Sequence, residues 1–126
     1  MYQAYLLLKS DADFTLEAAR QRLGEQFPDA TFVEGGDLLA MATDDWNIGL
    51  QINAGPEVLV DSQRIAEQVT GVNDDQGIAE CARRVEIASD VPDPEMDHFE
   101  KFQRVLDAMR TFAGVIAVDP NEPCVL

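Results

Sequence analysis

Residues 83–113, RRVEIASDVPDPEMDHFEKFQRVLDAMRTFA, contain the two clearest structural signals of the chain. Val85 and Ile87 alternate with polar or small residues, which is the period of a strand with one buried face. Pro92 and Pro94 must end that strand, because proline lacks an amide donor and biases the preceding residue toward extended geometry. The stretch therefore begins with a predicted strand and a sharp acidic loop.

A two-faced helix is predicted to follow the loop. Asp93 is placed as its N-cap and Pro94 as its first residue. Apolar residues then recur at three- and four-residue steps and form one stripe: Met96, Phe99, Phe102, Val105, Leu106, Met109, Phe112 and Ala113. The other side carries two acid-before-base pairs four residues apart, Asp97–Lys101 and Glu100–Arg104. Burial of the stripe outweighs these pairs, so we expect packing on a sheet to hold the helix.

The remaining segments supply that sheet and further helices. Strands are predicted over residues 2–9, 31–33, 38–43, 46–53 and 115–118. Thr15 is predicted to cap a helix that stops at Pro28, and a second helix is predicted over residues 62–69. Residues 58–60 are either a short strand or an apolar lead-in to that second helix. Residues 71–76 are expected to form a polar loop, followed by a short helix that carries Ile78.

This order of elements predicts the fold class. Hairpin signals such as Gly35-Gly36 favour antiparallel pairing, and helices that alternate with the strands favour a layered arrangement. We therefore expect a single domain over residues 1–126, an α+β two-layer sandwich with a mainly antiparallel sheet and helices on one face, of ferredoxin-like type. A mixed sheet is the alternative.

The composition limits the class of partner. The 126 residues include 24 Asp or Glu but only nine Lys or Arg, for a formal net charge of −15. Such a charge repels nucleic acid and anionic membranes and attracts a basic protein, although it can also reflect a lineage's composition or a salty habitat. We predict a protein partner, basic in charge, with no nucleic-acid and no membrane partner. The absence of a long apolar run and the presence of only two cysteines, Cys81 and Cys124, predict a cytoplasmic protein with reduced thiols.

The candidate catalytic residues are Glu95 and His98, the latter being the only histidine. On a helix that starts at Pro94 they would lie three apart near the N-terminus, where a carboxylate and an imidazole could act as an acid/base pair or as metal ligands. A helix start attracts acidic residues in any protein, and no ligand spacing such as Cys-x-x-Cys accompanies the pair. A structural histidine is therefore the alternative, and we predict no metal site and no cofactor.

A row of amides supplies the second candidate site. Asn47, Gln51 and Asn53 alternate with apolar residues, so they share the wet face of the predicted strand. Arg84 and Glu86 could add a two-pronged donor and a carboxylate, although an intramolecular ion pair between them is the alternative. These five residues are the predicted binding residues.

The function is inferred from the absence of catalytic motifs and from the general character of the chain. The chain has no glycine-rich phosphate loop and no nucleophile elbow. In size, acidity and lack of a catalytic signature it resembles small bacterial cytosolic proteins that act by binding, such as immunity proteins that neutralise basic toxins; the resemblance is one of general character, without a shared residue pattern. We expect a non-enzymatic protein-binding or regulatory module, and the alternative is a small hydrolase or lyase that uses Glu95 and His98.

The strand patterns also predict a homodimer. Leu39 with Met41, and Tyr5 with Leu7, suggest apolar groups on both faces of the sheet, more than one helix layer would cover. A two-fold dimer is the simplest way to bury the second face.

Overall fold

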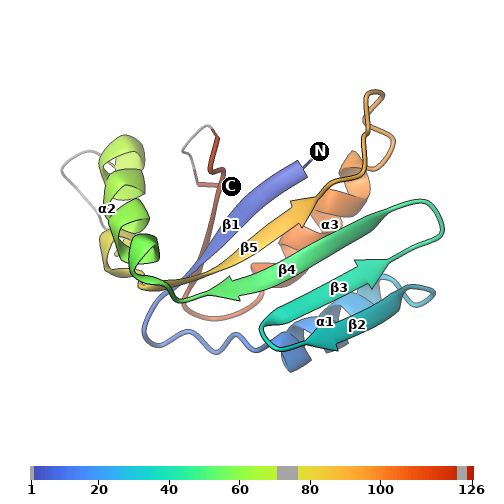
Figure 1. Ribbon diagram of the computed structural model, residues 1–126, viewed down its shortest axis with the longest axis horizontal. Coiled ribbons are helices and arrows are strands. Elements are labelled where there is room, and N and C mark those ends of the chain that lie inside the picture. Colours follow the sequence, from blue (N-terminus) through green and yellow to red (C-terminus); the bar gives the residue numbers. More distant parts are fainter. Residues whose placement is uncertain (1, 71–76, 122–124) are drawn as a thin grey trace.

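The computed structural model describes residues 2–70, 77–121 and 125–126, and in them one sheet is combined with three α-helices (Figure 1). In chain order the elements are β1 (Tyr2–Leu8), α1 (Leu16–Gln26), β2 (Thr31–Gly35), β3 (Leu38–Ala42), β4 (Asn47–Asn53), α2 (Pro56–Thr70), the 3-10 helix η1 (Ile78–Glu80), β5 (Arg83–Ser89), α3 (Phe99–Met109) and β6 (Val115–Val118). None of the described helices combines the length and the apolar character needed to span a bilayer. The predicted loop over residues 71–76 lies outside the described residues.

The sheet is antiparallel throughout, with strand order β2-β3-β4-β5-β1-β6. This confirms the antiparallel prediction over the mixed alternative, and the α+β class with it. The register also decides which residues share a face. Leu50 pairs with Leu39 on one side and Ile87 on the other, and all three side chains are buried.

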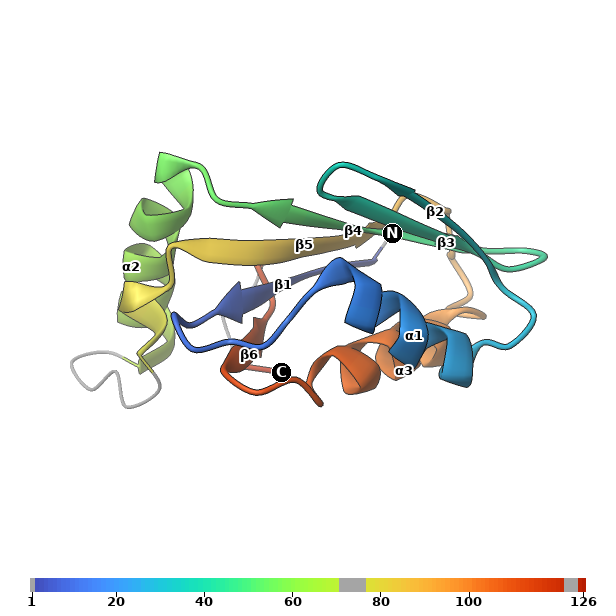
Figure 2. The same cartoon turned by 90° about the horizontal axis from the view of Figure 1, so that it is seen from below.

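Helices α1 and α3 pack side by side on this buried face (Figure 2). The Thr15 hydroxyl caps α1 as predicted, because it accepts a hydrogen bond from the amide of Ala18 at 3.1 Å. Below the sheet, α1 contributes Ala19 and Leu23 to the main core, and α3 contributes its apolar stripe, Phe102, Val105, Leu106 and Met109. The predicted stripe therefore lies on the sheet from Phe102 to Phe112, whereas Phe99 and Ala113 at its two ends are exposed.

Helix α2 lies on the opposite face, contrary to the expectation that all helices share one side. Its residues Ile65 and Ala66 form a second core with Leu7 of β1 and Ile116 and Val118 of β6. These two strands are apolar on both faces, so each face needs a cover. Because α2 sits at the β1–β6 end, it leaves the rest of that face without a helix (Figure 1).

The start of α2 also differs from the prediction of a helix over residues 62–69. The helix begins at Pro56, where a missing amide donor has no consequence and the fixed φ suits the first turn. The Asn53 side chain supports this start by accepting a hydrogen bond from the amide of Gly55 at 2.9 Å. Val58 is accordingly helical and fully buried, so residues 58–60 are neither a strand nor a lead-in.

The start of α3 was predicted too early. The Asp93 carboxylate accepts hydrogen bonds from the amides of Asp97 at 2.8 Å and His98 at 2.9 Å, as an N-cap would. Met96, however, has a φ of 59°. A residue with positive φ cannot continue a right-handed helix, so the chain turns here and α3 begins only at Phe99. Met96 is consequently 58% exposed and does not belong to the buried stripe.

Phe102 tests the assignment of the buried helix face. Its ring is buried and stacks on Tyr2 with centroids 5.1 Å apart. We expect Phe102→Ala to lower the free energy of unfolding by about 3 to 5 kcal/mol through lost burial and a residual cavity. The exposed Glu100 on the other side is the control, and Glu100→Ala should change that free energy by less than ~0.5 kcal/mol. Equal urea midpoints for the two variants would contradict the assignment.

Candidate binding face on the open side of the sheet

One half of a sheet face carries no helix, and we call it the open face. It comprises the outward side chains of β2 to β5 beyond the reach of α2, with α1 and α3 behind the sheet (Figure 1). A hollow of about 530 Å³ lies on it, lined by Gln3, Thr31, Val33, Leu38, Ala40, Met41, Ala42, Asn47, Ile48, Gly49, Gln51, Glu86, Ala88 and Asp90. The open face is therefore a concave surface made by the four neighbouring strands β2 to β5, with Gln3 of β1 at its border.

The register arranges the open face as a shallow trough that runs across the strands. One cross-strand row consists of Val33, Ala40, Gly49, Ala88 and Gln3. Its centre is low because alanine and glycine barely rise above the backbone. A taller row on one side contains Leu38, Gln51 and Glu86, and the row on the other side contains Thr31, Ala42 and Asn47.

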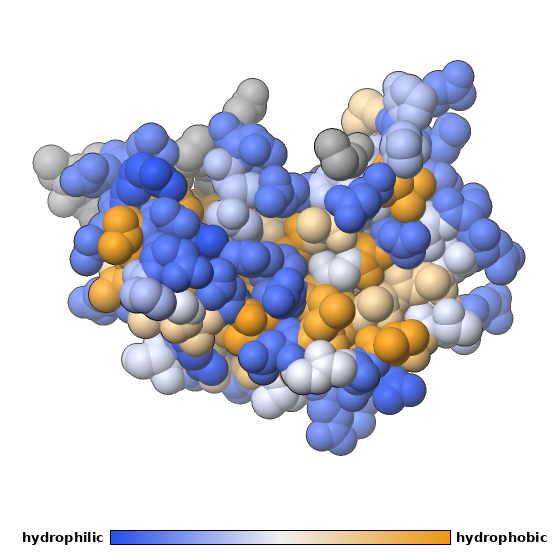
Figure 3. Space-filling model, in the orientation of Figure 1, coloured by the Kyte–Doolittle hydropathy of each residue, from blue (hydrophilic) through white to orange (hydrophobic). Residues whose placement is uncertain are grey.

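The open face exposes large apolar side chains next to this trough. Val33 is 71% exposed and Leu38 is 43% exposed. Figure 3 shows hydrophobic surface gathered over β2, β3 and β4, with polar residues around it. A contiguous apolar patch with a polar rim is typical of a binding surface.

The charge of the open face has one sign. Glu86 and Asp90 are among its lining residues, which include no lysine, arginine or histidine. Glu86 is held by Arg84 at 2.9 Å, whereas the structure gives Asp90 no partner among the described residues. The open face is thus locally acidic, in line with the charge of −15 for the chain.

Three of the five predicted binding residues line the open face: Asn47, Gln51 and Glu86. The side chains of Asn47 and Gln51 are exposed, and within the described residues neither is hydrogen-bonded. Their amide groups are therefore available to a partner's polar atoms.

Asn53 and Arg84 instead connect the end of this face to α2. The Arg84 guanidinium is buried, contacts Asp61 of α2 at 3.0 Å and Glu86 at 2.9 Å, and lies 4.0 Å from the centre of the Tyr5 ring. Burial favours loss of its proton, but the hydrogen bonds to Glu86 and Asp61 outweigh this effect and raise the pKa of Arg84. The Asn53 amide donates to Glu86 at 3.0 Å. Both residues thus hold α2 against β4 and β5.

The apolar residues behind the dimer prediction are covered within the chain. Leu39 and Met41 are buried in the core shared with α1 and α3, and Leu7 is buried under α2. On the open face the exposed large apolar side chains are those of Val33 and Leu38, which strand periodicity did not single out. Only the register places them beside Ala40 and Gly49 on one surface.

The structure does not pair Glu95 with His98. Glu95 is exposed in the turn before α3, and its side chain has no hydrogen bond or ion pair among the described residues. His98 is half-buried against Trp46, with ring centroids 6.3 Å apart. In the described part of the chain, His98 Nδ1 and Trp46 Nε1 have no hydrogen-bond partner, and no cluster of three His, Cys, Asp or Glu could hold a metal ion.

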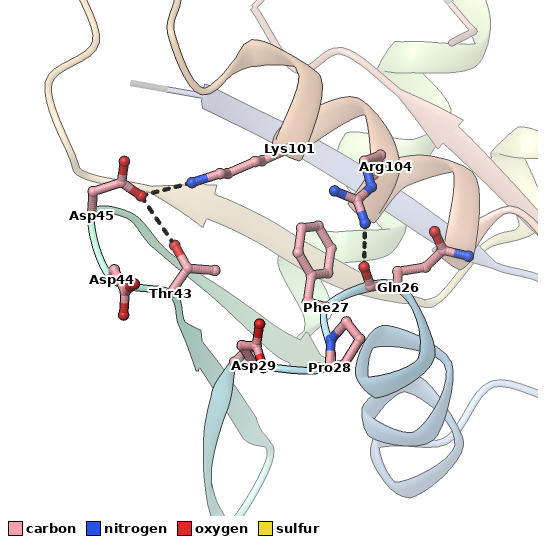
Figure 4. Close-up of a pocket in the computed structure, with 10 residues that line it drawn as sticks. Gln26, Phe27, Pro28, Asp29, Thr43, Asp44, Asp45, Lys101 and Arg104 are labelled. Carbon is pink, nitrogen blue, oxygen red and sulfur yellow. Dashed lines mark hydrogen bonds and ion pairs between the residues drawn. The ribbon is translucent and has the colours of Figure 1, made fainter.

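A second hollow, of about 480 Å³, lies between the end of α1, the β3–β4 turn and α3 (Figure 4). Lys101 donates to Asp45 at 2.7 Å, and this hydrogen bond lowers the pKa of the Asp45 carboxyl. Arg104 donates to the Gln26 carbonyl and lies 4.4 Å from the centre of the Phe27 ring. Both cations have partners from distant segments, so the predicted pairing with Asp97 and Glu100 is wrong.

The acidic loop is linked to β1 by the Tyr2 hydroxyl, which donates to Asp93. Partial desolvation and this hydrogen bond raise the pKa of Tyr2 from 10.0 to about 12. Partial desolvation disfavours the charged form of Asp93, but the hydrogen bonds from Tyr2 and from the amides of His98 and Asp97 prevail and lower the pKa of Asp93. The two groups therefore stabilise the fold over a limited pH range.

Tyr2→Phe tests this linkage. A raised tyrosine pKa stabilises the fold below pH 10.0 and ceases to do so as the pH rises through about 12. A lowered aspartate pKa stabilises the fold above the unfolded value and ceases to do so as the pH falls below about 4. We expect the stability difference between wild type and Tyr2→Phe, measured by denaturant unfolding, to be largest near neutral pH and to shrink toward both extremes. A difference that stays constant across the range would refute the linkage.

Comparison of the chain with protein-family models, with curated proteins and with solved structures gave no match. The chemistry of the open face is therefore the basis on which its function is inferred.

Proposed function

We propose that this protein is a non-enzymatic protein-binding module and that the open face is its binding surface. The observation that carries the proposal is an incompletely covered sheet. Val33 and Leu38 are exposed beside the free amides of Asn47 and Gln51. Apolar anchors next to unpaired polar groups provide affinity and orientation together.

The charge of the chain supports a basic partner. The lining of the open face has carboxylates and no cation, and the chain as a whole carries −15. Such a field raises the rate of association with a cationic surface, and salt screens it. The affinity itself comes from burial of a few anchors such as Leu38.

The fold is proposed to be an elaborated ferredoxin-like sandwich. A core of β1-α1-β4-β5-α3-β6 would have the spatial order β6-β1-β5-β4, which is consistent with a βαββαβ arrangement. The hairpin β2–β3 and the helix α2 would then be additions to that core. The hairpin extends the sheet and α2 covers only the far end, so both additions define the open face. We propose that the module acts in the cytoplasm.

Gln51→Arg tests the proposal because it places a cation in the middle of the open face. The matched control is Gln21→Arg on α1, which makes the same charge change on the other side of the sheet. For a partner isolated from the host with the wild-type protein, we expect Gln51→Arg to weaken binding, raising the dissociation constant roughly tenfold or more. Gln21→Arg and His98→Gln should leave it within about twofold, and the wild-type association rate should fall as salt increases.

Two results would overturn the proposal. One is a partner that binds Gln51→Arg as tightly as wild type, provided that the variant is folded. The other is loss of activity in folded His98→Gln or Glu95→Gln, which would favour the hydrolase or lyase alternative.

A further inference from the structure

Gly49 has no explanation in the packing of its own chain. A glycine in a strand interior destabilises the strand relative to alanine. Its backbone does not require glycine, because the glycines with positive φ are Gly36, Gly77 and Gly114 among the described residues. Nor does Gly49 form a bulge, since it pairs regularly with Ala40 and Ala88.

The neighbours of Gly49 leave room for a Cβ atom. A Cβ atom at this position would meet Leu38 Cδ1 at 3.8 Å and the Ala88 carbonyl oxygen at 3.9 Å, which are ordinary contacts. The missing side chain therefore leaves space on the solvent side, in the centre of the open face. A strand glycine of this kind is typical of a site where another backbone approaches closely.

We propose that the open face receives a cationic amphipathic helix of the partner protein, which lies in the trough with its backbone against Gly49. This inference rests on the proposed function and names the occupant of the same site. The strands β3, β4 and β5, which form the floor of the trough, are each paired on both sides, so only the edge strand β2 offers a free edge and an extended peptide lying in the trough would find none. A helix satisfies its own backbone hydrogen bonds and can press on a surface of small residues.

The dimensions of the trough fit such a helix. The two rows that flank the low row, one with Leu38 and the other with Ala42, lie four residues apart along the strands, which is roughly 13 Å. A helix with its side chains is about 10 to 12 Å across. The low row of Ala40, Gly49 and Ala88 would lie under its apolar side, with Leu38 and Val33 beside it.

Charge distinguishes this occupant from a second copy of the chain. Two copies that met through the open face would each bring a net charge of −15 and place Glu86 and Asp90 close to their counterparts. Lysines or arginines on the polar side of a helix would instead meet these carboxylates. The amides of Asn47 and Gln51 can orient the helix from the two rims.

The experiment is an NMR titration of the full chain with a synthetic peptide of Leu, Ala and Lys about 18 residues long, roughly 27 Å as an amphipathic helix. We expect shift changes centred on Ala40, Gly49 and Ala88, together with a gain of helical circular dichroism. Gly49→Val should weaken binding at least tenfold without lowering the melting temperature. Gly24→Ala is the control: it adds a methyl group on α1, where nothing lies within 4 Å, and should leave binding unchanged.

Each contrary result has a defined meaning. The helix inference fails if the peptide does not bind, if the shifts map elsewhere, if Gly49→Val binds as well as wild type, or if a peptide with Glu in place of Lys binds equally. Concentration-dependent shifts of the same residues without peptide would identify a second copy as the occupant and also overturn it. The proposed function survives these failures if Gln51→Arg still releases the host partner, so the two proposals can fail separately.

Discussion

Strand β1 is buried on both of its faces, and the rest of the structure depends on this constraint. Leu6 and Leu8 face α1 and α3, whereas Leu7 between them faces α2. Each of these side chains contributes roughly 1.5 to 3 kcal/mol when it is removed from water. Neither face can be left open near β1 without losing that contribution, so helices must lie on both sides of the sheet at this point.

The position of α2 follows from that requirement and is secured by polar contacts. The buried Arg84 joins Asp61 of α2 to Glu86 of β5, two carboxylates that are themselves partly exposed. The buried Ser62 hydroxyl donates to the Cys81 carbonyl at 2.7 Å and ties the helix to the segment before β5. Since Arg84 is the group that Asp61 and Glu86 share, the cluster favours a single placement of α2. The edge of the open face is thereby defined as well.

The open face is unfavourable for stability when the chain is considered alone. Val33 and Leu38 remain largely exposed and gain little from burial. Glycine at position 49 has a lower strand propensity than alanine would have, although the backbone there does not require glycine. Elsewhere in the sheet the same sequence places apolar residues under helices and caps α1 with Thr15. Local departures from these rules are expected where a surface serves a partner, because selection there acts on binding as well as on folding.

Local patterns in the sequence were sufficient to predict the buried face of the main helix, the antiparallel strands and the solvent-facing side of β4 with Asn47 and Gln51. They were sufficient because side chains repeat every two residues in a strand and every 3.6 residues in a helix, whatever lies nearby. The pairing of Lys101 with Asp45 and the side taken by α2 depended on groups far away in the chain. The alignment of Val33, Ala40, Gly49 and Ala88 in one trough likewise required the register between four strands. Periodicity reports which residues share a face, but the covering of that face is decided by tertiary contacts, because burial is a property of the whole packed chain.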